Sequence, residues 1–127
     1  MIIVDTYEPI VLVELLQADK KPLPAGDISI ECDTTQVLIE RKTWDDAYGS
    51  WQSKRLEAQI TKMLQSDCPV ILLIEGNPND SWVRGESEDV SSFLTEVNGQ
   101  SSGPNRYRQL RKFLMRMNVE VLPVVFT

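Results

Sequence analysis

The pattern of apolar and polar positions divides the chain into strands and helices. Short apolar or alternating runs predict strands over residues 2–5, 27–31, 36–42, 69–74 and 119–126. Apolar residues at helical spacing predict helices after Pro9, after Thr43, over residues 85–97 and over residues 106–118. Segments of loop composition lie at residues 20–26 and 98–104. This mixture of elements predicts an α/β protein.

Local signals refine several of these elements. Residues 32–35 have turn composition and predict a hairpin between the strands at 27–31 and 36–42. The hydroxyl of Thr43 suits a helix N-cap. The continuous apolar run at residues 69–74 predicts a central strand that is buried on both faces. Each of three predicted helices has one apolar stripe. The stripe of the first helix consists of Ile10, Val13, Leu15 and Leu16, and the stripe of the helix after Thr43 consists of Leu56, Ile60, Met63 and Leu64. The stripe of the last helix consists of Tyr107, Leu110, Leu114 and Met117.

Length and composition place the chain among ordinary globular proteins. Its 127 residues are the usual size of one domain, with 42% hydrophobic and 25% charged residues. No apolar run approaches the length of a membrane span, and the N-terminus lacks a signal-peptide pattern, so an intracellular protein without membrane contact is predicted. Cys32 and Cys68 are then expected to be reduced thiols. The net charge of -6 argues against indiscriminate binding of nucleic acid through bulk charge.

The chain contains no histidine. This excludes Ser-His-Asp and Cys-His catalysis, and leaves acidic residues and lysine as the main candidates for chemistry. Oxygen ligands suit magnesium or manganese, so Mg²⁺ or Mn²⁺ is the expected cofactor of any metal site.

The charged end of the strand at residues 36–42 is the main candidate site. Side chains alternate along a strand, so Glu40 and Lys42 point to one face and Arg41 points to the other. Removing these charges from water at the end of a buried strand costs free energy, so their presence there indicates a functional site. Asp27 and Glu40, from adjacent strands, are predicted to hold one ion, whose bound water Lys42 orients.

Two further acids and one pair on a helix extend this site. Asp5 and Asp46 are candidates to ligate the ion or its waters, although a strand end and a helix start also explain them separately. Arg55 and Gln59 are neighbours on a helix and are predicted to point from the edge of the core into the site.

Basic residues on the last predicted helix are candidates for DNA contacts. Arg106, Arg108 and Arg111 are predicted to form a surface that positions phosphates without reading sequence. A solvated helix face explains the same residues equally well.

The order of these motifs resembles the signature of the XPF-type structure-specific endonucleases. Gly26-Asp27, then Glu40-Arg41-Lys42, then Asp46 match the Gly-Asp, Glu-Arg-Lys and Asp of that family. The similarity extends to residues 3–9, 69–76 and 106–127, and to Arg55 and Gln59. It implies a restriction-endonuclease-like fold, a mixed central β-sheet flanked by helices, with the site at one end of the sheet.

The resemblance implies a metal-dependent DNA endonuclease that acts on branched or flap DNA. The implied catalytic residues are Asp27, Glu40, Arg41, Lys42 and Asp46, and the implied metal ligands are Asp5, Asp27 and Glu40. The candidate DNA contacts are Arg55, Gln59, Arg106, Arg108 and Arg111. Two alternatives stay open, which are a catalytically silent scaffold subunit of such a nuclease and another restriction-like enzyme such as a junction resolvase. The presence of all the acidic signature residues favours the active nuclease.

Two departures from the family pattern matter. Tyr7 stands where the family has Arg, which removes one expected cation. Residues 1–127 are expected to form a single XPF-type nuclease domain without the tandem helix-hairpin-helix domain that usually follows. We therefore expect weak DNA binding by this chain alone. We also expect a partner, which is a second copy in a homodimer, a different chain in a heterodimer, or a separate DNA-binding subunit.

Overall fold

The structure, a computed structural model, describes residues 1–77 and 103–127, with side chains in the second range from residue 107 onward. The helix predicted over residues 85–97 lies outside the described residues. The elements in chain order are β1 Ile2–Val4, α1 Ile10–Leu16, β2 Asp19–Lys20, β3 Ile28–Cys32, β4 Thr35–Thr43, α2 Trp44–Gln52, α3 Arg55–Leu64, β5 Val70–Glu75, α6 Gly103–Glu120 and β6 Val124–Phe126.

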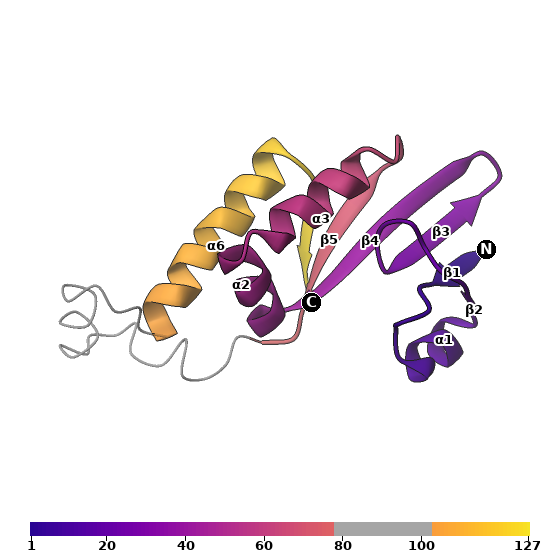
Figure 1. The fold of residues 1–127 in the computed structure, drawn as a ribbon, viewed down its shortest axis with the longest axis horizontal. Coiled ribbons are helices and arrows are strands. Elements are labelled where there is room, and N and C mark those ends of the chain that lie inside the picture. The colour runs from indigo at the N-terminus through magenta and orange to yellow at the C-terminus, as the bar shows by residue number, and fades with distance from the viewer. Residues whose placement is uncertain (78–102) are drawn as a thin grey trace.

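The strands form one mixed sheet in the order β2-β1-β3-β4-β5-β6. The pairs β1–β3 and β3–β4 are antiparallel, whereas β1–β2, β4–β5 and β5–β6 are parallel. Figure 1 shows α2, α3 and α6 side by side against the half of the sheet that contains β4 and β5, with α1 at the other end beside β1 and β2. The predicted α/β class and mixed sheet are thus confirmed.

The core lies between this group of helices and one face of the sheet. The apolar stripes predicted from helical spacing face inward, because burying one stripe is what stabilises a surface helix. The fully packed side chains include Leu56, Ile60 and Met63 of α3, Leu110, Leu114 and Met117 of α6, and Leu72 and Ile74 of β5. Leu64 was predicted to join this stripe and does not; it is 45% exposed at the end of α3.

The central strand β5 is buried on one face rather than on both. Val70, Leu72 and Ile74 are buried, while Ile71 and Leu73 are half-buried. The prediction of two buried faces was wrong because the helices pack on the Leu72 face. A run of apolar residues alone does not show how many layers cover a strand.

The helical segment after Thr43 is two helices and not one. The predicted cap is confirmed, since Thr43 Oγ1 accepts a hydrogen bond of 3.2 Å from the backbone N–H of Asp46. The helix then ends at Gln52, and Lys54 adopts a left-handed conformation with φ of 64°. This turn redirects the chain, so that α3 places its own apolar stripe on the sheet.

The remaining differences from prediction lie at the ends of the sheet. Residues 119–126 were predicted to be one strand, but α6 continues to Glu120 and β6 begins at Val124, just after Pro123. The strand β2 has two polar residues and was read as the start of a loop. The helix α1 begins after Pro9 as predicted, yet it contains no buried residue. Within the described ranges, no helix is both long enough and apolar enough to cross a membrane.

The N-cap at Thr43 gives a first test of this fold. We expect Thr43→Ala to lower the free energy of unfolding by about 0.5–2 kcal/mol, because the N–H of Asp46 loses its partner. Thr43→Ser keeps a hydroxyl at the same position and should restore most of that loss. Urea titration of the two variants beside the wild type measures both changes. Equal stability of the alanine and serine variants would show that the cap does not stabilise α2.

Candidate active site

The end of β4 carries two opposite charges on its helix-facing side. Leu38 and Glu40 are both buried on this face, and Glu40 is only 6% exposed. Lys42 follows on the same face, with its Nζ 3.8 Å from Glu40 Oε1. Strand alternation alone predicted this pairing. The carboxylate of Glu40 therefore has a cation nearby, in surroundings with little water.

The backbone of β4 fixes Asp27 beside Glu40. The N–H of Asp27 donates to the carbonyl of Ile39 at 2.8 Å, and Asp27 Oδ2 accepts from the N–H of Arg41 at 2.7 Å. Gly26 precedes it with a φ of 78°, a conformation that glycine adopts without strain. A Cβ at Gly26 would also lie 3.4 Å from the carbonyl oxygen of Ile39. The Gly-Asp pair thus has a physical basis, since the turn delivers the carboxylate to the charged end of β4.

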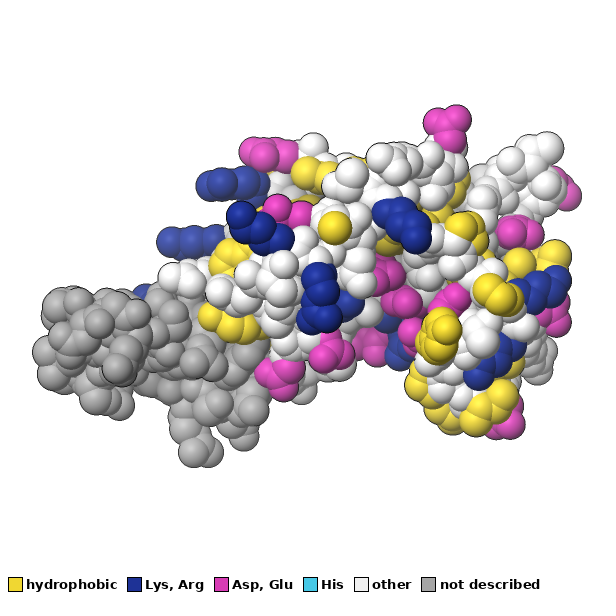
Figure 2. All heavy atoms as spheres, viewed as in Figure 1, with side chains coloured by type: hydrophobic (Ala, Val, Ile, Leu, Met, Phe, Trp, Pro, Cys, Tyr) yellow, Lys and Arg dark blue, Asp and Glu magenta, His cyan; other side chains and the backbone are white. Residues whose placement is uncertain are grey.

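Asp27 and Glu40 line a common cavity of about 210 Å³. Its walls are the loop that leads into β3 and the helix α3, which contributes Gln59 and Lys62. Gln59 Oε1 is buried and has no hydrogen-bond partner among the described residues. Figure 2 shows acidic side chains gathered in a hollow between the helical part of the molecule and the part that contains α1. The cavity is therefore polar, acidic and open to a ligand.

The carboxylates at this site perturb one another. Burial and, next, the charge of Asp27 raise the pKa of Glu40 to about 8, against the opposing effect of Lys42. Burial and the charge of Asp27 also raise the pKa of Glu8, while Arg41 acts in the other direction. Both shifts have the same cause, because desolvation and a neighbouring like charge disfavour the ionised form of a carboxyl group. A bound cation would relieve this repulsion.

Arg41 acts as a bridge between two other carboxylates. Its guanidinium donates to Glu8 on one side and to Glu75 on the other, where the Nη2–Oε2 distance is 3.0 Å. These contacts hold the two acids in place, and the catalytic role of Arg41 stays a prediction. Glu8 was not predicted at all. It belongs to the opening segment at residues 3–9 that carries the family resemblance, so the signal was available.

Two predicted acids do not join Asp27 and Glu40 in the cavity. Asp5 Oδ1 accepts from the N–H of Leu23 at 2.8 Å and Oδ2 from the N–H of Tyr7 at 3.3 Å, so its carboxylate holds the backbone after β1. Its role as a metal ligand stays a prediction. Asp46 lies in the first turn of α2 and lines a second cavity of about 170 Å³. The other acids of that second cavity are Glu8 and Glu75, and its cations are Arg41 and Lys42.

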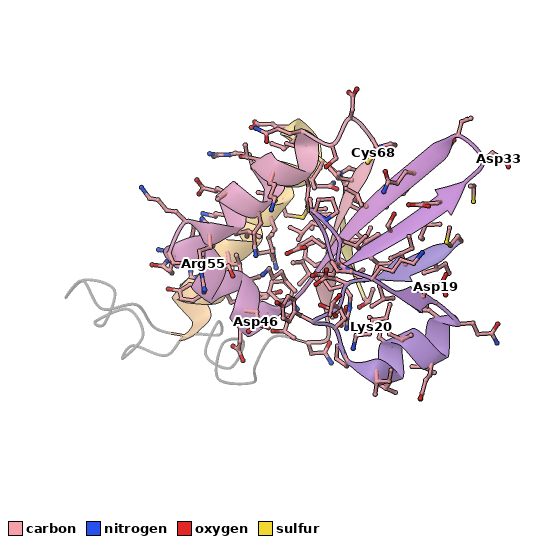
Figure 3. All side chains as sticks on the ribbon, turned by 45° about the vertical axis from the view of Figure 1, so that its right-hand side comes forward. Asp19, Lys20, Asp33, Asp46, Arg55 and Cys68 are labelled. Atoms are coloured by element: carbon pink, nitrogen blue, oxygen red, sulfur yellow. The ribbon has the colours of Figure 1, made fainter. Side chains whose placement is uncertain are left out.

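The predicted DNA contacts occupy different places. Gln59 lines the cavity as expected, whereas Arg55 is exposed at the start of α3, where its Nε donates to Ser53 Oγ at 3.0 Å. Figure 3 shows Asp46 and Arg55 on the helical side of the molecule and Asp33 at the tip of the β3–β4 hairpin. The prediction that Arg55 points into the site was therefore wrong, because its side chain is exposed and bonds to Ser53 in the turn before α3.

The predicted basic surface on α6 is exposed. Arg108 and Arg111 are both solvent-accessible, and the guanidinium carbon of Arg111 lies 5.7 Å from the centre of the Tyr107 ring. The side chain of Arg106 lies outside the described residues. A role in DNA contact stays a prediction for all three arginines.

The donor set of the cavity fits a hard divalent ion. Among the described residues, no group of three or more Asp, Glu or Cys side chains converges tightly enough to enclose a metal. Mg²⁺ is usually held by one or two carboxylates, with waters and substrate phosphates completing its coordination. Asp27 and Glu40 supply two carboxylates, and the unpartnered oxygen of Gln59 can accept from a bound water. The chemistry of these residues therefore suits Mg²⁺ or Mn²⁺.

Residues 11–124 match the ERCC4 domain family. This chain belongs to the ERCC4 domain family. The fold of this ERCC4 domain is similar to that of XPF from Aeropyrum pernix, with a TM-score of 0.63 and 21% sequence identity over 99% of this chain and 51% of that chain. A structure of XPF from Aeropyrum pernix in complex with DNA is also similar, with a TM-score of 0.50 and 23% identity over 94% of this chain and 64% of that chain.

These comparisons confirm two predictions, the resemblance to XPF-type nucleases and the fold class. The ERCC4 domain described here spans less than two thirds of the length of either solved relative. No curated protein sequence matches this chain.

The raised pKa of Glu40 predicts how stability depends on pH without metal. The folded protein keeps a proton on Glu40 up to about pH 8, whereas the unfolded chain loses it near the ordinary value of 4.5. The folded state therefore binds more protons between these values, and its stability falls as pH rises, by at most about 1.4 kcal/mol per pH unit.

Glu40→Gln should remove this part of the pH dependence, because the amide does not titrate. Urea unfolding of both proteins in EDTA, at intervals from pH 5 to pH 8.5, measures the difference between the two profiles. Parallel profiles would contradict the assignment of a buried, protonated Glu40.

Proposed function

We propose that this ERCC4 domain is a divalent-metal-dependent endodeoxyribonuclease that hydrolyses phosphodiester bonds at branched or flap DNA inside the cell. The observation that carries this proposal is the cavity in which Asp27 and Glu40 meet, with Lys42 beside Glu40. The family assignment and the similarity to an XPF structure in complex with DNA support it.

Each residue has a distinct task in this proposal. Asp27 and Glu40 would hold Mg²⁺ or Mn²⁺, which when bound supplies Lewis acidity and lowers the pKa of a ligated water. Lys42 balances the charge of Glu40 and presents an ammonium group to the reacting phosphate. Arg41 pairs with Glu8 and Glu75, and its positive charge offsets part of the repulsion that the charge of Glu8 adds at Glu40.

We propose that part of the affinity for DNA comes from outside this chain. A net charge of -6 and a small acidic cavity are unfavourable for holding a polyanion. We propose that a second copy, a different subunit or a separate DNA-binding domain provides most of the affinity. Arg55 and the three arginines of α6 would add phosphate contacts that position the branch point.

Metal binding is the first direct test of the site. Millimolar Mg²⁺ or Mn²⁺ should raise the melting temperature, since the ion binds the folded form only. Asp27→Asn should abolish most of that rise. Asp33→Asn is the matched control, because Asp33 is exposed at the hairpin tip with a φ of 47°, which asparagine tolerates. The same metal response in both variants would remove Asp27 from the metal site.

Cleavage assays test the catalytic roles. On labelled forks, flaps and junctions, Asp27→Asn should abolish cutting, and Lys42→Ala should lower turnover by about 10²–10³-fold, the usual effect of losing a group that stabilises developing charge. Lys42→Ala should still show the metal-dependent rise in melting temperature. Wild-type turnover in that variant would exclude Lys42 from the mechanism. A wild type that binds metal but cuts none of these substrates would support the scaffold alternative.

A further inference from the structure

Lys62 lies on the wall of the cavity that faces the two carboxylates. It follows Gln59 by three residues on α3, so both side chains belong to the same helix face. Both line the cavity together with Asp27 and Glu40. Sequence reasoning did not select Lys62, because an exposed lysine near the end of a helix is ordinary on any protein surface.

The other cations near the site are already paired. Lys42 lies 3.8 Å from Glu40, and Arg41 is engaged by Glu8 and Glu75. Lys62 forms no ion pair with any residue in the described ranges. Among the described residues that line the cavity, it is also the only cation. A lysine held over an acidic cavity without a partner has its charge available for a ligand.

The charge balance of the cavity indicates which kind of ligand Lys62 would bind. One divalent ion neutralises the two carboxylates of Asp27 and Glu40, and Lys42, which pairs with Glu40, lies outside the residues that line this cavity. Tyr7, in the segment before α1, adds no charge and is 94% exposed. A phosphodiester oxygen entering the cavity therefore needs a further cation, and Lys62 is the side chain placed to provide it.

We propose that Lys62 binds a phosphate of the DNA strand that enters this cavity, and that α3 and the acidic loop form opposite walls of one phosphodiester-binding cleft. This inference rests on the proposed nuclease function, because it assigns the substrate-binding wall of the same site. Gln59 also lines the cavity, and its buried side-chain oxygen can accept a hydrogen bond from an ordered water at the phosphate.

The test compares three variants with the wild type. Lys62→Gln removes the charge, Lys62→Arg retains it, and Lys54→Gln removes the same charge from the turn before α3, two helical turns away. Affinity for a fluorescently labelled forked DNA is measured by anisotropy at several salt concentrations, with Ca²⁺ in place of Mg²⁺. Thermal melts with and without Mg²⁺ report the fold and the metal site of each variant.

Lys62→Gln should weaken binding by about five- to tenfold, the effect of losing one charge-assisted contact. The slope of log affinity against log salt concentration should become shallower by about 0.9. Each phosphate contact releases counterions, and this variant makes one contact fewer. Lys62→Arg should restore both values, and Lys54→Gln should match the wild type. The metal-dependent rise in melting temperature should be the same in all four proteins.

Three outcomes would overturn the inference. These are wild-type affinity and slope in Lys62→Gln, an equal loss in Lys54→Gln, and a wild type that does not bind the fork. A fourth outcome separates the two proposals. If Lys62→Gln loses affinity as expected while the wild type with Mg²⁺ or Mn²⁺ cuts no DNA, the nuclease proposal fails and the phosphate contact of Lys62 stands.

Discussion

The structure of this site depends on one unfavourable arrangement, a carboxylate buried at the end of a strand beside a second carboxylate. Glu40 is almost inaccessible to solvent and lies next to Asp27, so its ionised form is disfavoured. The surrounding elements limit this cost: Lys42 is near on the same face, and the β4 backbone donates to Asp27. A small, doubly charged ion bound by these carboxylates would relieve the repulsion that remains.

The sequence predicted the parts of the fold that depend on local chemistry. The hairpin, the Thr43 cap and the stripes of α3 and α6 follow from residue types at short spacing. The sequence could not show that β5 is covered on one face only, because layering is a property of tertiary packing. It also did not show the break at Lys54, since a lysine in a left-handed conformation carries no sequence signal. At the C-terminus, α6 extends to Glu120 and includes Val119, although valine favours strands and this side chain is 82% exposed.

The site was predictable where the strand period determined it and less so elsewhere. Alternation along β4 is sufficient to place Glu40 and Lys42 on one face. Whether Asp5 reaches the cavity depends on a loop geometry that only the backbone hydrogen bonds reveal. The roles of Arg41 and Glu8 follow from an ion pair between residues far apart in the chain, which no single-sequence pattern encodes. Lys62 became notable only when the opposite wall of the cavity was known.

The bridge made by Arg41 also affects how this domain can change over evolution. Glu8 is anchored to β4 through Arg41, whereas α1, which begins two residues later, buries none of its side chains. Substitutions at the exposed positions of this helix do not alter the ion pair that holds this carboxylate. The segment from residue 10 to residue 16 is thus a region in which descendants of this protein can acquire new recognition surfaces while the chemistry at the end of β4 is preserved.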